Sequence, residues 1–92
     1  TRAAAGPATV LVVEDDAGIA ELERDRLEEA GYAARVAHTA ADALAAVTAG
    51  GIDLVLLDYR LPGGIDGLEF YARVKAAGYD VPVILVTGVG NE

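Results

Sequence analysis

Short runs of apolar residues recur along the chain and are separated by longer stretches of mixed polarity. The runs are Thr9 to Val13, Tyr32 to His38, Ile52 to Leu57 and Val81 to Thr87. The first and third contain continuous apolar segments, TVLVV and LVLL, which are typical of strands buried on both faces of a parallel sheet. The second is diluted by three alanines and predicts a weaker strand. Pro82, near the start of the fourth run, is tolerated at the beginning of a strand.

The stretch from Asp16 to Ala30 predicts the first helix. Gly31 follows it as a stop signal. The apolar residues of this helix fall within one stripe and are Ile19, Leu22, Leu27 and Ala30. Two charged residues also project into this stripe and narrow the apolar face of the helix.

Two further helices are predicted after the second and third runs. Thr39, followed three residues later by Asp42, resembles a capping box, in which each side chain satisfies an amide at the start of a helix. Gly50 and Gly51 end this helix. The third helix is predicted from Leu68 to Ala77, with apolar residues at spacings of three. These are Leu68, Tyr71 and Val74.

Strands that alternate with helices indicate an α/β fold, because right-handed crossovers build a parallel sheet with helices on both faces. In such sheets, sites form beyond the carboxyl ends of the strands, where the strand order reverses. We therefore expect the residues at the ends of the runs to share one edge of the sheet. They are Glu14, Asp15 and Asp16 after the first run, Asp58 after the third, and Thr87 with Gly88 at the end of the fourth.

Carboxylates crowd this predicted edge, and they repel one another or share protons unless a cation joins them. Mg²⁺ is the best match, because it takes one or two carboxylates, keeps several waters and completes its octahedron with phosphate oxygens. Ca²⁺ requires more protein oxygens. An aspartate beside such an ion, with a hydroxyl and glycine amides opposite, can attack a phosphoryl group and carry it as an aspartyl phosphate.

Some of these residues also have a structural interpretation. Asp16, taken alone, is best explained by the amino end of the following helix, where the macrodipole favours negative charge. His38 is interpreted as a surface loop residue rather than a ligand. The segment GGIDG is interpreted as a turn into a helix, because its glycine spacing fits neither a Walker loop nor a dinucleotide fingerprint.

Composition narrows the classes of function. The 92 residues suffice for one small domain, and 53% of them are hydrophobic, as a globular core requires. The net charge of -8 argues against direct binding of nucleic acid. With no cysteine and one histidine, a disulfide scaffold is excluded and a zinc site is disfavoured. No signal segment and no apolar run of roughly 18 residues is present, which predicts a cytoplasmic protein without membrane association.

Three segments, VLVVEDD, LVLLDYRLPGGIDG and VPVILVTG, resemble in this order the receiver domain of bacterial two-component response regulators. The resemblance extends from Thr9 to Asn91. It implies a flavodoxin-like, doubly wound parallel sheet of the CheY-like family, with strand order 2-1-3-4 as far as the chain goes. We therefore predict a receiver domain over residues 9–92, incomplete at its carboxyl end, after a linker or disordered start over residues 1–8. The lack of methionine adds the expectation of an internal or processed start.

The resemblance also implies a role for each residue at the predicted edge. In the family, the aspartate that ends the third strand accepts the phosphoryl group, which places this role on Asp58. The acidic pair, here Glu14 and Asp15, binds Mg²⁺ together with Asp58 and the backbone carbonyl two residues later, here that of Arg60. The hydroxyl at the end of the fourth strand, here Thr87, hydrogen-bonds the phosphoryl group and moves during activation.

Two features depart from the family pattern. The segment PGGIDG carries one residue more than usual between the proline and the Asp-Gly pair. The family also has a fifth strand that ends in a phosphate-binding lysine, whereas this chain stops after the fourth strand and its single lysine, Lys75, lies within a predicted helix. We therefore expect the fourth strand to be an uncovered edge, which favours a homodimer through that strand. We also expect the 92 residues to hold phosphate poorly.

The predicted function is that of a phosphorylation-dependent switch in two-component signalling. A histidine kinase or phosphotransfer protein donates the phosphoryl group to Asp58, and the domain acts on an output domain that the sequence does not identify. One alternative is a metal-dependent phosphohydrolase of the haloacid-dehalogenase type, which is disfavoured because Arg60 occupies the position of its general-acid aspartate. The other is a degenerate receiver that serves only as an interaction module, which is disfavoured because the acidic pair, the acceptor and the hydroxyl are all present.

Overall fold

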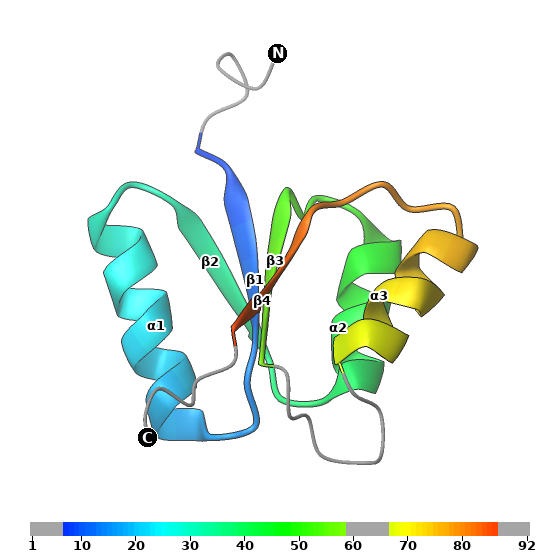
Figure 1. Ribbon diagram of the computed structural model, residues 1–92. Coiled ribbons are helices and arrows are strands. Elements are labelled where there is room, and N and C mark those ends of the chain that lie inside the picture. The colour runs from blue at the N-terminus through cyan, green and yellow to red at the C-terminus, as the bar shows by residue number, and fades with distance from the viewer. Residues whose placement is uncertain (1–6, 59–66, 87–92) are drawn as a thin grey trace.

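The computed structural model describes residues 7–58 and 67–86, which form a parallel sheet flanked by helices (Figure 1). Along the chain the elements are β1 (Thr9–Val13), α1 (Ala17–Glu29), β2 (Ala33–Ala37), α2 (Ala40–Ala49), β3 (Leu54–Asp58), α3 (Gly67–Ala76) and β4 (Val83–Val86). The strands are ordered β2-β1-β3-β4, and every neighbouring pair is parallel. The predicted fold class and strand order are confirmed. β1 has the predicted bounds, and the ends of the other three strands differ from the predicted ones by one or two residues.

The sheet separates two helical layers, with α1 on one face and α2 and α3 on the other (Figure 1). Alternate residues of β1 serve the two faces, because successive side chains of a strand point in opposite directions. Leu11 and Val13 belong to the main core between the sheet and α2 and α3. The other buried members of this core are Ala37, Ala40, Ala43, Val47, Val55, Leu57, Phe70, Val74 and Val81.

Helix α1 packs against the sheet through a different face from the predicted stripe. Its buried residue is Ala20, which allows close approach to the strands, and Leu27 is half-buried. Ile19 and Leu22 are instead 46% and 52% exposed. The periodicity therefore predicted the helix correctly but not which side faces the sheet.

Helix α3 also presents a different side to the core from its predicted stripe. Val74 is buried as expected, but Tyr71 is 42% exposed, and Phe70 takes the core position instead. Phe70 and Val74 are four residues apart, so they lie on one side of the helix. A stripe at spacings of three was therefore the wrong choice for this helix.

Side-chain caps define where α1 and α2 begin. The Asp16 carboxylate accepts a hydrogen bond from the amide of Ile19 at 2.9 Å, and Thr39 Oγ1 accepts one from the amide of Asp42 at 3.1 Å. Both residues have extended backbone angles typical of an N-cap. At the far end of α1, Gly31 has φ of 100°, a conformation that glycine adopts without strain.

Asp16→Ala is expected to lower the free energy of unfolding by about 1 kcal/mol, because the amide of Ile19 loses its acceptor. Urea denaturation followed by circular dichroism measures this change. Asp16→Asn is the matched control, since an asparagine oxygen caps a helix as well as a carboxylate does. An equal loss of stability in the asparagine variant would mean that the charge, not the cap, matters at this position.

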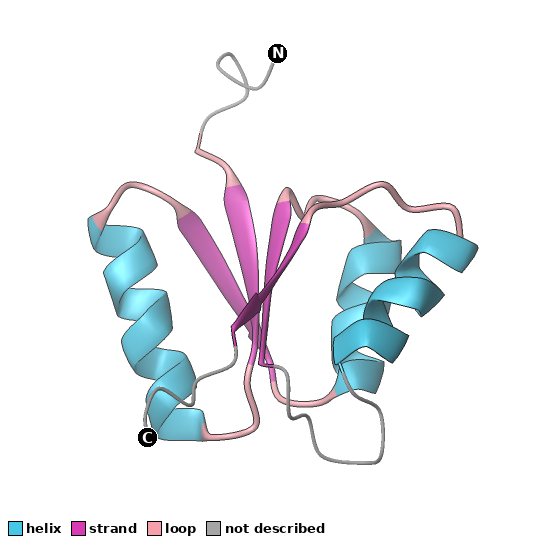
Figure 2. Cartoon of the chain, viewed as in Figure 1, coloured by secondary structure: helices cyan, strands magenta, loops and turns pink. Residues whose placement is uncertain are grey.

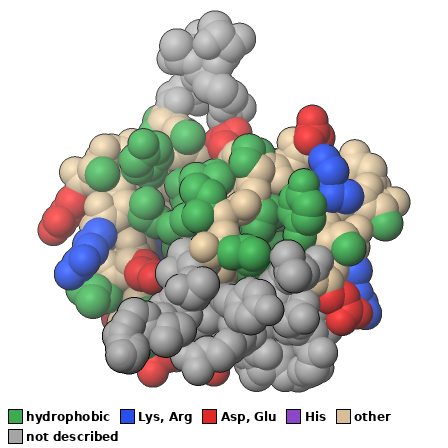
Figure 3. Space-filling view, viewed as in Figure 1, with side chains coloured by type: hydrophobic (Ala, Val, Ile, Leu, Met, Phe, Trp, Pro, Cys, Tyr) green, Lys and Arg blue, Asp and Glu red, His purple; other side chains and the backbone are tan. Residues whose placement is uncertain are grey.

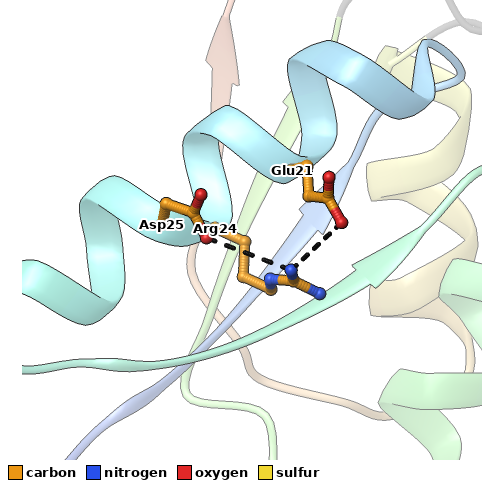
Figure 4. A network of polar contacts seen from close by, with 3 residues as sticks. All are labelled: Glu21, Arg24 and Asp25. Carbon is orange, nitrogen blue, oxygen red and sulfur yellow. Dashed lines mark hydrogen bonds and ion pairs between the residues drawn. The ribbon is translucent and has the colours of Figure 1, made fainter.

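Helix α1 carries a local charge network (Figure 4). Arg24 Nη2 lies 3.3 Å from Glu21 Oε2 and 3.9 Å from Asp25 Oδ1. The side chains of Arg24, Glu21 and Asp25 are 39%, 68% and 62% exposed, respectively. Exposed ion pairs contribute little to stability, so this network is not what holds α1 on the sheet.

Hydrophobic side chains gather at the middle of the face that β4 occupies (Figure 3). On β4, Ile84 is 48% exposed and Leu85 is 36% exposed. The register pairs Ile84 with Leu56 and Leu85 with Leu57, so the two side chains lie on opposite faces of the sheet. Within the described residues, both faces of β4 are therefore only partly covered, as expected for this strand.

The helices among residues 7–58 and 67–86 are all too short or too polar to cross a bilayer.

Candidate functional site

The carboxyl ends of all the described strands meet at the lower edge of the sheet in Figure 2. The register makes this alignment specific, because Val13 at the end of β1 pairs with Leu57 of β3 and with Ala37 of β2. The residues that follow, Glu14 and Asp58, therefore stand side by side in the backbone. Asp58 in turn pairs with Val86, the last residue of β4. The predicted clustering of strand ends at one edge is thus present in the backbone.

Glu14 is held at this edge through both its backbone and its side chain. Its amide donates to the carbonyl of Ala37 at 3.0 Å, and its carbonyl lies 2.9 Å from Nδ1 of His38. Its Oε2 accepts a hydrogen bond from the amide of Asp16 at 3.2 Å. The residue is 8% exposed, which makes it the one buried charged residue in the described part of the chain. Burial of a carboxylate is costly unless its oxygens are hydrogen-bonded, and Oε2 is.

Asp15 and Asp16, although adjacent, have different environments. Asp16 is engaged as the N-cap of α1, which agrees with its structural interpretation. Asp15 is exposed, so its carboxylate is accessible to an ion at the surface. Glu14 and Asp15 thus combine one oriented, buried carboxylate with one accessible carboxylate beside the end of β3, a donor set that suits a hard cation such as Mg²⁺.

Several predicted site residues fall outside what the structure describes. For Asp58 the backbone is described at the end of β3, but the side chain is not. Arg60 and Thr87 lie outside the described residues. Among the described side chains, no three acidic or histidine groups are close enough to hold a metal ion. The assignments of Asp58, Arg60, Thr87 and the metal site therefore stay predictions.

Lys75 lies far from this edge, as its position in the chain indicated. It is near the end of α3, and Nζ donates to Asp80 Oδ1 at 3.1 Å in the connection to β4. The hydrogen bond to Asp80 and its charge raise the pKa of Lys75. In an alternating α/β chain, the end of a helix leads to the amino end of the next strand, so Lys75 is at the edge opposite Glu14.

His38 is the residue at this edge whose contact the sequence did not reveal. It is exposed, as predicted, but its ring contacts the backbone of Glu14 rather than only solvent. A carbonyl accepts hydrogen bonds and does not donate them, so Nδ1 carries the proton in this contact. The available signal was positional, because His38 follows β2 just as Glu14 follows β1.

Comparison with known proteins agrees with the resemblance to response regulator receiver domains. A model of the response regulator receiver domain family matches residues 10–92. The chain is 41% identical over 78 residues to the uncharacterized transcriptional regulatory protein YkoG of Bacillus subtilis, covering 85% of this chain and 34% of that protein. It is 38% identical over 86 residues to the phosphate regulon transcriptional regulatory protein PhoB of Pseudomonas aeruginosa, covering 91% of this chain and 37% of that protein. The chain thus spans about a third of the length of these relatives.

Solved structures show the same similarity in three dimensions. A receiver domain (CheY-like) from Methylobacillus flagellatus superposes with a TM-score of 0.84 at 30% identity, over 94% of this chain and 74% of that one. The response regulator protein TrrA from Thermotoga maritima, solved in complex with Mg²⁺-BeF, gives a TM-score of 0.81 at 36% identity. That superposition covers 90% of this chain and 71% of TrrA.

Proposed function

The chain belongs to the response regulator receiver family, and from that premise we propose that Asp58 is its phosphoacceptor. Receiver domains are phosphoacceptor modules of two-component signalling rather than catalytic enzymes, and they use Mg²⁺. The observation that carries the proposal is the register that aligns the end of β1 with the end of β3. This register supports the proposal because Glu14, the first residue of the acidic pair, and Asp58 directly follow the paired residues Val13 and Leu57.

In the proposed reaction a carboxylate oxygen of Asp58 attacks the phosphorus of a phosphohistidine. An O–P bond forms, the P–N bond breaks, and the departing imidazole takes the electron pair and then a proton. Water later attacks the same phosphorus and restores the carboxylate with release of inorganic phosphate. The donor is proposed to be a histidine kinase or phosphotransfer protein, and the phosphorylated domain to act on an output domain.

The residues at this edge fit a magnesium ion. Glu14, Asp15, Asp58 and the backbone carbonyl of Arg60 would hold it, and this set of oxygen donors is the type that Mg²⁺ prefers. When bound, the ion neutralises carboxylate and phosphoryl charge. The proposal is supported by the buried, hydrogen-bonded carboxylate of Glu14 beside the accessible one of Asp15, and by the Mg²⁺-BeF complex of the similar protein TrrA.

Thr87 is proposed to donate its hydroxyl hydrogen to the phosphoryl group and to report phosphorylation by moving. Its support is positional, since it directly follows Val86, which pairs with Asp58. The partly exposed Ile84 and Leu85 support the further proposal that β4 associates with a second copy of the chain.

Labelling by a small phosphodonor tests the proposed function. The protein is incubated with acetyl phosphate and Mg²⁺, and intact mass spectrometry is used to detect the addition of one phosphoryl group that is stable in acid and lost in base. No labelling with or without Mg²⁺ would instead favour a receiver that acts only as an interaction module.

Mg²⁺ well above its dissociation constant is expected to stabilise the protein by about 1 to 3 kcal/mol through mass action. The double variant Glu14→Gln plus Asp15→Asn should lose most of this stabilisation, while the side-chain carbonyl oxygen of the new glutamine can still accept from the amide of Asp16. Melting curves with and without Mg²⁺ measure the difference. Glu28→Gln plus Glu29→Gln removes the same charge from the far end of α1 and serves as the control. Equal magnesium shifts in the two double variants would refute the metal assignment.

A further inference from the structure

We propose that His38 is a positioning residue for the divalent cation site, acting through the backbone carbonyl of Glu14; this inference rests on the proposed function. The contact is direct, with Nδ1 of His38 2.9 Å from the Glu14 carbonyl oxygen. It links the end of β2, which bears no proposed ligand, to the end of β1, which bears two. His38 itself touches neither the proposed ion nor the phosphoryl group in this proposal.

The geometry of the peptide bond explains how a contact at Glu14 reaches Asp15. A peptide group is planar, so the carbonyl of Glu14 and the amide of Asp15 belong to one rigid unit. Fixing the carbonyl direction restricts the rotation on both sides of that unit, and hence the direction in which each side chain leaves the backbone. The His38 ring therefore acts on the acidic pair as a whole.

The strand pairing shows why a side chain is suited to this task. The parallel ladder between β1 and β2 continues one step past Val13, where the amide of Glu14 donates to Ala37. The chain then turns away, because Thr39 caps α2. The imidazole of His38 adds one more hydrogen bond beyond this last ladder step, and so extends the restraint on β1 to the Glu14 carbonyl.

The other contacts of Glu14 make the restraint effective. With its amide, carbonyl and Oε2 all hydrogen-bonded, Glu14 has its backbone and carboxylate oriented before any ion arrives. A site that is ordered in advance loses less conformational freedom on binding, which raises affinity. Removing the His38 bond would take away one restraint on the Glu14–Asp15 peptide, so ordering this peptide when the ion binds would cost more conformational freedom.

Three substitutions separate this role from a general effect at the surface. In His38→Asn the side-chain amide nitrogen can occupy the position of Nδ1 and keep a donor. His38→Gln carries its amide one carbon further from the backbone, and His38→Ala has no donor.

Calorimetric titration with MgCl₂ gives the dissociation constant of Mg²⁺ for each variant. We expect His38→Ala and His38→Gln to bind Mg²⁺ about two- to tenfold more weakly than the unaltered protein, the change that one net hydrogen bond implies. His38→Asn should stay within about twofold of the unaltered protein.

Two further measurements report the structural effect of each substitution and the position of the proton on the His38 ring. Melting temperatures without Mg²⁺ report any structural loss separately, and a long-range ¹H–¹⁵N spectrum of the neutral His38 ring should show the proton on Nδ1. Unchanged magnesium affinity in His38→Ala, equal affinity in the asparagine and glutamine variants, or a ring with its proton on Nε2 would each overturn the role of His38. If the unaltered protein neither binds Mg²⁺ nor takes phosphate, the proposed function itself fails, and the inference fails with it.

Discussion

Asp58→Asn is expected to abolish labelling by acetyl phosphate while leaving the fold intact. The amide is nearly the same size as the carboxylate but lacks the charged oxygen that attacks phosphorus, so the nucleophile is lost without a change in shape. Intact mass spectrometry after incubation with acetyl phosphate and Mg²⁺ measures the labelled fraction over time. Circular dichroism should show an unchanged spectrum, since Asp58 is the last residue of β3 and its backbone pairing with Val86 does not depend on the side chain.

Asp80→Asn provides the matched control for this experiment. It makes the same chemical change at a side chain that is 96% exposed and paired with Lys75 at the opposite edge of the sheet. Its labelling rate should equal that of the unaltered protein. Labelling of the Asp58 variant at the same rate as the Asp80 variant would show that the phosphoryl group goes to another residue.

The strands and the parallel sheet could be predicted because they depend on local composition and on a general rule of topology. Continuous apolar segments such as TVLVV and LVLL are compatible with few structures other than a buried strand. Once strands alternate with helices, right-handed crossovers leave few arrangements open. The order β2-β1-β3-β4 itself came from the family resemblance, which the register now supports pair by pair.

The faces of the helices could not be predicted equally well. Apolar periodicity in α1 favoured a stripe through Ile19 and Leu22, but the helix packs through Ala20. A small residue lets the helix axis approach the sheet, and this gain is not visible in a pattern that counts large apolar residues. Which side of a helix is covered depends on its neighbours in space, and these are fixed by the whole fold.

Candidate site residues were predictable to the extent that they follow strand ends. The positions of Glu14, Asp15 and Asp58 follow from the rule that sites lie beyond the carboxyl ends of parallel strands. The burial of Glu14 and its contact with His38 do not follow from that rule. They require the register of β2 on β1, which brings two residues 24 positions apart in the chain into hydrogen-bonding distance.

Phe70→Ala is expected to lower the free energy of unfolding by about 3 to 5 kcal/mol, the cost of removing a large buried side chain and leaving a cavity. Phe70 is 1% exposed and belongs to the core between the sheet and α2 and α3. A small domain has a total stability of about 5 to 15 kcal/mol, so this single change brings it close to unfolding. Urea denaturation measures the loss.

Tyr71→Ala is the control that decides which side of α3 faces the core. Tyr71 is the neighbour of Phe70, is also aromatic and is 42% exposed, so its loss should cost far less than that of Phe70. The stripe predicted from spacings of three, through Leu68, Tyr71 and Val74, leads to the opposite ranking. If Tyr71→Ala proves as destabilising as Phe70→Ala, or more so, then α3 is rotated toward that stripe.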